Sequence, residues 1–97
     1  MTNTEIRNFQ TQLLTVLKGS WCIIETSSSY VMGQVRNVDL RNLNLLLSPA
    51  AVVLSGAVLR FRAVLVRGSD VRKVLVCENE DECEKKLETV RRISGLV

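Results

Sequence analysis

The pattern of apolar and polar positions changes along the chain, and each change marks a different kind of element. Between residues 4 and 17, apolar side chains recur at steps of three and four, which predicts an amphipathic helix. Thr4 is placed to cap the start of this helix and Gly19 to end it. The apolar stripe consists of Ile6, Phe9, Leu13, Leu14 and Leu17.

From Trp21 onward, short runs of β-forming residues alternate with turn residues, which predicts strands. Gly33 inside one run predicts a bulge or a sharp bend, and Pro49 inside another predicts a bend or an edge position. Antiparallel strands joined by such tight turns commonly curl into a small barrel. The predicted strands cover 22–25, 30–38, 43–54, 57–66 and 71–76, and the turns cover 27–29, 55–56 and 67–70.

The last part of the chain returns to a helical period. Residues 79–82 are rich in acids, which suits the positive end of a helix dipole. The apolar stripe of this helix is Cys83, Leu87, Val90 and Ile93. The predicted fold class is therefore mainly β: an N-terminal helix, a strongly bent five-stranded antiparallel barrel and an extra C-terminal helix. Residues 1–78 form the predicted domain and residues 79–97 a helical extension.

The length and the cysteine content argue against several classes of protein. The 97 residues suit one domain, and the chain contains no apolar run of membrane-spanning length and no apolar signal core near its start. The three cysteines, Cys22, Cys77 and Cys83, have no C-x-x-C spacing, and there is no histidine. This pattern argues against a zinc site and against a disulfide framework, and predicts reduced thiols in a nuclear or cytoplasmic protein.

Charge and motifs argue for binding rather than catalysis. Residues 1–77 hold nine basic and four acidic residues, whereas residues 78–97 hold four basic and six acidic ones. A basic body with an acidic tail favours a polyanion partner, although ordinary solvated charge explains the count equally well. There is no histidine base, nucleophile motif or phosphate-binding glycine loop. We therefore expect no enzyme activity and no cofactor.

Two turn segments carry a recognisable signature. Gly33 is followed six residues later by Asp39 and then by Leu43-Asn44, and the second segment reads Val66-Arg67-Gly68-Ser69 before an aliphatic strand. Together they resemble the two motifs of the Sm and Sm-like family, and the order of helix and strands resembles that family over nearly the whole chain. One departure is that four residues separate Asp39 from Asn44, where the family usually has three.

The resemblance implies a slot for one base of single-stranded RNA. Asn44 would pair with the edge of a uracil, Asp39 would orient Asn44, and Arg67 would stack on the base. Gly68 would let the backbone approach the base. The implied RNA-binding residues are Asp39, Arg41, Asn42, Asn44, Arg67, Gly68 and Ser69. From the residues alone, Asp39 and Asn44 can equally be turn residues, and Arg67-Gly68 only a tight hairpin.

The resemblance also implies an assembly. In the family, edge strands of adjacent subunits pair to close a ring, so segments 57–66 and 71–76 are the expected interfaces; Arg60 and Arg62 belong to such a contact or to a solvated face. Val38-Asp39, Val71-Arg72-Lys73-Val74 and Val90-Arg91-Arg92-Ile93, without an Arg-Gly repeat tail, most resemble the D1-type branch and its Sm-like relative in the histone pre-mRNA processing particle. This resemblance implies a nuclear heteromeric ring on a uridine-rich small nuclear RNA. The alternatives are an Sm-fold assembly module that binds no RNA, or a subunit of a spliceosomal or RNA-decay ring.

Overall fold

The computed structural model describes residue 12 and residues 15–95 of the chain. Residues 12 and 15–17 are helical, and the chain leaves the helix at Lys18 and Gly19, where Gly19 has a φ of 87°. This end of the predicted N-terminal helix is therefore confirmed. Ile6, Phe9, Leu13 and Leu14 of the predicted stripe lie outside the described residues, whereas Leu17 is buried.

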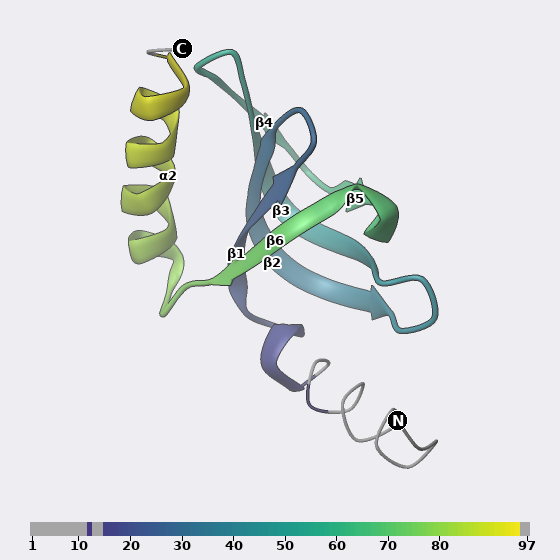
Figure 1. Ribbon diagram of the computed structural model, residues 1–97. Coiled ribbons are helices and arrows are strands. Elements are labelled where there is room, and N and C mark those ends of the chain that lie inside the picture. The colour runs from purple at the N-terminus through teal and green to yellow at the C-terminus, as the bar shows by residue number, and fades with distance from the viewer. Residues whose placement is uncertain (1–11, 13–14, 96–97) are drawn as a thin grey trace.

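The strands follow the predicted order, with one difference (Figure 1). Segment 57–66, predicted as one strand, is broken into two. β3 pairs with the first part through residues 50–54 and with the second through residues 45–47, and Ser48 and Pro49 lie between the two pairings. At the break, the Ser48 hydroxyl donates to the Arg62 carbonyl over 2.6 Å. The strands are β1 Trp21–Thr26, β2 Tyr30–Asp39, β3 Asn44–Leu54, β4 Ala57–Phe61, β5 Val64–Val66 and β6 Val71–Val76, with a 3-10 turn η1 at Gly68–Asp70.

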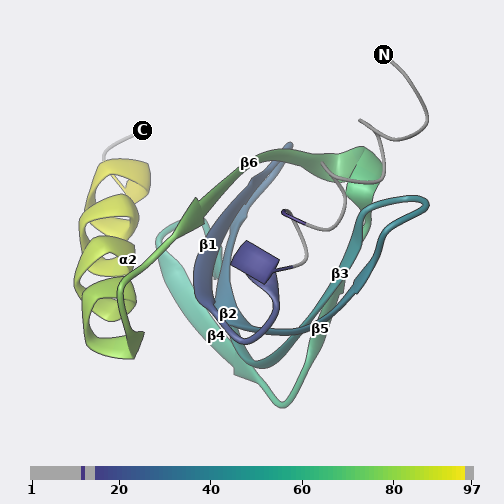
Figure 2. The same cartoon turned by 90° about the horizontal axis from the view of Figure 1, so that it is seen from below.

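All strands form one antiparallel sheet in the order β4-β3-β2-β1-β6, with β5 paired to β3. The sheet curls strongly enough to enclose an interior, and helical residues 15–17 lie at one opening of it (Figure 2). The pairing register of β2 with β3 shifts after Gly33. A Cβ on Gly33 would lie 2.7 Å from the Pro49 carbonyl oxygen, so the predicted bend depends on the missing side chain.

The sheet is buried on both faces where it meets α2 Glu80–Gly95. One apolar cluster fills the barrel and includes Ile24 and Leu47; the other lies between the sheet and α2 and includes Ile23, Cys83 and Leu87. This explains why the first four residues of β1, Trp21 to Ile24, are all apolar rather than alternating with polar residues. Ile93, predicted on the buried stripe of α2, is exposed, because the apolar contacts of the helix lie in its first half.

Polar contacts also hold α2 against the sheet. Arg60 of β4 pairs with Glu84 over 3.3 Å, and Arg91 donates to the Gly56 carbonyl over 2.7 Å. Cys77 and Cys83 form a disulfide between the end of β6 and the first turns of α2, with their Cα atoms 5.5 Å apart. The prediction of reduced thiols is therefore wrong for this pair. Among the described residues, no helix is long and apolar enough to cross a membrane.

Cys22 is the remaining cysteine and is fully buried in the barrel. Burial raises the pKa of its thiol to about 11, so the reactive thiolate is scarce at pH 8. We expect iodoacetamide to leave Cys22 unmodified at pH 8 in the folded, non-reduced protein and to alkylate it after denaturation, as read by intact-mass spectrometry. Rapid alkylation of the folded protein would contradict the burial of this thiol.

Candidate functional site

The two motif turns meet because β3 pairs with β5. Leu45 at the start of β3 lies opposite Val66 at the end of β5. Because the two strands are antiparallel, Asn44, which precedes Leu45, and Arg67, which follows Val66, come together at the same end of the sheet. They border an open hollow on the surface. Its lining residues are Asn42, Asn44, Arg67, Gly68 and Ser69.

Asp39 organises the first turn. One carboxylate oxygen accepts the Arg41 backbone N–H over 3.0 Å, and the other accepts from the side-chain amides of Asn42 and Asn44, each over 3.3 Å. The Leu43 N–H donates to the Asp39 carbonyl over 2.6 Å and closes the loop, with Leu43 at a φ of 58°. Asp39 is therefore a turn-forming residue and, through the same carboxylate, the residue that holds Asn44.

Asn44 joins the two turns. Its side-chain oxygen accepts the Gly68 backbone N–H over 2.8 Å, while its nitrogen donates to Asp39. A backbone N–H can only donate, so the orientation of the amide is fixed from both sides. One N–H and one lone pair of the amide remain for another partner. That pair of groups matches the carbonyl and ring N–H of a uracil edge.

Gly68 has a different role from the one its motif implied. A Cβ at this position would overlap the Asn42 carbonyl oxygen and would lie 2.9 Å from the Leu43 carbonyl carbon and oxygen. The space that the missing side chain leaves is thus taken by the backbone of the first turn. Gly68 is needed for the two turns to approach each other. That it also lets the backbone approach a base stays a prediction.

Two cationic residues differ in their relation to the hollow. Arg67 lines it, and its guanidinium forms no hydrogen bond or ion pair with the described residues. Arg41 is exposed in the same loop but does not line the hollow. Of the seven predicted residues, five line the hollow, Asp39 positions two of those five, and Arg41 lies outside. Within the described ranges, no cluster of three His, Cys, Asp or Glu residues could hold a metal ion.

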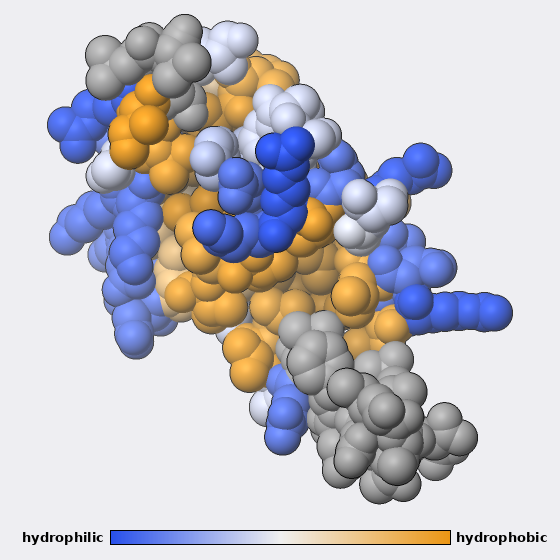
Figure 3. All heavy atoms as spheres, viewed as in Figure 1, coloured by the Kyte–Doolittle hydropathy of each residue, from blue (hydrophilic) through white to orange (hydrophobic). Residues whose placement is uncertain are grey.

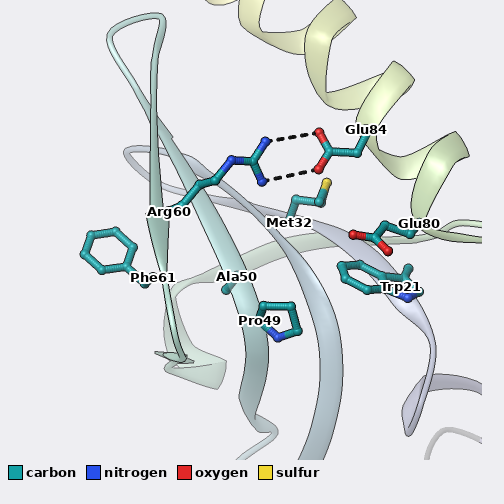
Figure 4. A pocket seen from close by; sticks show the side chains of 8 residues that line it. All are labelled: Trp21, Met32, Pro49, Ala50, Arg60, Phe61, Glu80 and Glu84. Atoms are coloured by element: carbon teal, nitrogen blue, oxygen red, sulfur yellow. Dashed lines mark hydrogen bonds and ion pairs between the residues drawn. The ribbon is translucent and has the colours of Figure 1, made fainter.

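A second hollow, between β4 and α2, has no counterpart in the motif analysis. Trp21 lies beside it on β1, Glu80 and Glu84 face it from the helix, and Phe61 borders it from β4 with its ring on the far side of the strand (Figure 4). The remaining lining residues are Met32, Pro49, Ala50 and Arg60. The sequence feature that could have indicated an acidic side of this hollow is the four-residue spacing of Glu80, Glu84 and Glu88, which places three acids on one helix face.

No protein-family model matches the chain, and no curated protein matches it. Several solved structures are similar to the chain. The P. aerophilum SmAP1 heptamer is 24% identical, with a TM-score of 0.63 over 71% of this chain and 93% of that one. A Pyrococcus abyssii Sm protein in complex with a uridine heptamer is 17% identical, with a TM-score of 0.60 over 69% and 96%. A chain of the NatC complex bound to CoA is 19% identical, with a TM-score of 0.58 over 76% and 92%.

Proposed function

We propose that this protein, whose similarity to archaeal Sm proteins shows the Sm fold, is an RNA-binding subunit of an Sm-type ring. The hollow at Asn44 and Arg67 would hold one base of a single-stranded, uridine-rich RNA. The observation that carries this proposal is the clamped amide of Asn44, which presents one donor and one acceptor next to the Arg67 guanidinium, which has no partner in the described part of the chain.

The expected affinity of one such slot is small. Stacking of a base on one planar side chain contributes about 1–3 kcal/mol. A single hollow would therefore bind RNA weakly. In a ring that repeats the hollow around a pore, the binding free energies of the separate bases would add up. The two similar archaeal structures fit this arrangement, since one is a heptamer and another holds a uridine heptamer.

The surface also favours assembly through strand edges. β4 and β6 end the sheet, so each has one backbone edge that no other described strand pairs with. Large apolar residues are exposed on these strands: Leu59 and Phe61 on β4, and Leu75 and Val76 on β6. Apolar atoms form much of the middle of the face in Figure 3, over the strands, with hydrophilic residues along α2. An adjacent subunit that adds a strand would cover such residues.

The finer assignments come from the resemblance of the motifs. A heteromeric ring, a small nuclear RNA as ligand, a nuclear location and a part in histone pre-mRNA 3′-end processing all stay predictions, as does the absence of enzyme activity. The likeness to the D1-type branch, on which the particle, RNA and location depend, rests on residues 38–39, 71–74 and 90–93.

A second candidate function is an assembly module that uses the Sm fold without binding RNA. Two observations favour it. The first turn has one residue more than the family usually has and carries Arg41 and Asn42 where an aromatic side chain would stack a base. The NatC complex also contains a chain of similar structure.

Variants of the slot separate the two functions. In a ring assembled from this protein and its neighbours, we expect Asn44→Ala and Arg67→Ala each to weaken retention of a uridine-rich oligonucleotide about tenfold, because each removes one contact of about 1–3 kcal/mol. Filter binding at fixed salt measures this. Arg92→Ala, which removes the same charge from an exposed site on α2, is the control and should bind as the unmodified ring does. Unchanged retention in both slot variants would favour the assembly module.

A further inference from the structure

The outer face of the sheet has two halves, which meet where β3 passes from its pairing with β5 to its pairing with β4. α2 covers the half that includes β4. Its Leu87 packs on that face with Met32 and Ala51 of the strands, and its Glu84 pairs with Arg60 over 3.3 Å. The covered half therefore combines an apolar contact with an ion pair between a strand arginine and a helix acid.

No described element covers the half of the outer face that includes β5. In Figure 1 and Figure 2, β5 and the first part of β3 lie on the side of the barrel away from α2. Leu46 of β3 and Leu65 of β5 are direct cross-strand partners on this face, where they are 37% and 65% exposed. Their neighbours Leu45 and Val66 face the interior. This half of the sheet thus has an apolar pair on its outer face without an apolar partner.

Two arginines border this apolar pair where the two halves of the face meet. The Arg36 Nε donates to the Ser48 carbonyl over 2.7 Å, and the Ser48 hydroxyl donates to the Arg62 carbonyl over 2.6 Å, so both arginines adjoin one residue of β3. Both are exposed, and neither guanidinium forms an ion pair with an acid in the described part of the chain. The chemistry matches the surface under α2, except that the acids are not supplied.

An amphipathic helix fits this surface better than an added strand does. β3 is hydrogen-bonded to β2 on one side and to β5 on the other, so it has no free backbone edge to which a strand could add. A sheet face is instead covered by the apolar stripe of a helix, as α2 covers the other half. The two guanidiniums favour a helix that carries acids beside its stripe.

RNA is the competing occupant, because the slot at Asn44 and Arg67 lies next along the same two strands. Two arginines without acids also suit phosphates. The apolar pair argues for protein, because it lies between the arginines and the slot. Its leucine side chains carry neither a ring on which a base could stack nor a polar group that could bond a ribose.

We infer that the uncovered face at Leu46 and Leu65 is a docking site for an amphipathic helix of a partner protein. The apolar stripe of that helix lies on the two leucines, and acids flanking the stripe pair with Arg36 and Arg62. The site uses a face of the sheet and neither of the edge strands β4 and β6. The inference therefore depends neither on the proposed ring nor on the RNA slot.

A designed peptide tests the apolar contact in the full-length protein. The probe is a labelled helical peptide of about five turns, with leucines at three- and four-residue steps and glutamates on both flanks of that stripe. We expect it to bind saturably in fluorescence anisotropy at fixed salt. Leu65→Ser should weaken binding about tenfold, because it removes one of the two apolar contacts. Leu54→Ser is the matched control, since Leu54 is 41% exposed at the far end of β3.

A charge exchange tests the ion pairs. The variant with Arg36→Glu and Arg62→Glu should bind the glutamate peptide about tenfold more weakly, and it should gain binding to a second peptide in which lysines replace the glutamates. Arg72→Glu combined with Arg92→Glu is the matched control, because it makes the same charge change at two exposed residues on β6 and α2. A misfolded variant could not gain binding to the lysine peptide.

Every result supports or overturns the inference. Absence of binding by the glutamate peptide overturns it, and so does binding that neither set of variants changes. Loss of binding in the double arginine variant without loss in Leu65→Ser indicates an anion site and overturns the apolar contact. Displacement of the peptide by a uridine-rich oligonucleotide from an Arg67→Ala protein assigns the face to RNA and overturns the protein partner. Circular dichroism checks that each variant keeps the fold.

Discussion

Gly68→Ala is expected to damage both the fold and the RNA site. The new Cβ would overlap the Asn42 carbonyl oxygen and crowd the Leu43 backbone, and neither is a flexible side-chain end that can swing away. The turns must then move apart, which costs about 3 kcal/mol and lowers the Tm by roughly 12–24 °C for a domain of this size. The hydrogen bond from Gly68 N–H to Asn44 would be lost with it, so RNA retention by the assembled ring should fall at least as far as in Asn44→Ala.

The neighbouring Ser69→Ala provides the control. Ser69 is exposed, and its hydroxyl forms no hydrogen bond with the described residues, so its removal should change the unfolding free energy by less than about 0.5 kcal/mol. Thermal unfolding followed by circular dichroism compares the two variants. A Gly68→Ala protein as stable as Ser69→Ala would show that the turns are not in the close contact described above.

Leu47→Ala is expected to be the most destabilising single truncation in the barrel. Leu47 is fully buried among the side chains that fill the interior, where β3 lies between β2 and β5. Truncating a leucine in such a place removes buried apolar surface and leaves a cavity, which costs about 2–5 kcal/mol. Urea denaturation should show a lower midpoint with an unchanged slope.

The adjacent Leu46→Ala is the matched control, because alternation along the strand turns Leu46 to the other face, where it is 37% exposed. The same chemical change there should cost less than about 1 kcal/mol. Equal losses at both positions would contradict the assigned register of β3.

The strand order was predictable because each strand is a run of β-forming residues bounded by Ser, Gly or Asp. The break between Phe61 and Val64 was not, because it follows from the bend of the partner strand β3 rather than from residues 57–66 themselves. The exposure of Ile93 was hidden for a similar reason: a helical stripe shows which residues share a face, but not how far along the helix the sheet extends.

The disulfide illustrates a different limit. Cys77 and Cys83 are six residues apart, with no spacing rule that pairs them. They meet because the chain turns from β6 directly onto the outer face of the sheet, so the first turns of α2 lie beside the end of the strand. Only the tertiary path brings these two sulfur atoms together.

The residues of the site could be named from the two motifs, and so could the contact of Asp39 with Asn44, which lies five residues away. The hydrogen bond from the Gly68 N–H to Asn44, and the backbone that fills the space at Gly68, could not be predicted, because they depend on contacts between segments more than twenty residues apart in the sequence. The hollow at Glu80 was harder to predict from the sequence, because it combines Trp21, Pro49 and Phe61 from three different strands with an acid from α2.

The measurement that tests the central claim most directly is a map of ultraviolet crosslinks between an assembled ring and a uridine-rich oligonucleotide. A base held between the two turns should crosslink to peptides that contain residues 39–44 or 67–69, and those crosslinks should disappear in the Arg67→Ala ring. Crosslinks confined to other segments, or no crosslinks at all from a ring that is intact by sedimentation, would contradict the assignment of this hollow as an RNA-binding site.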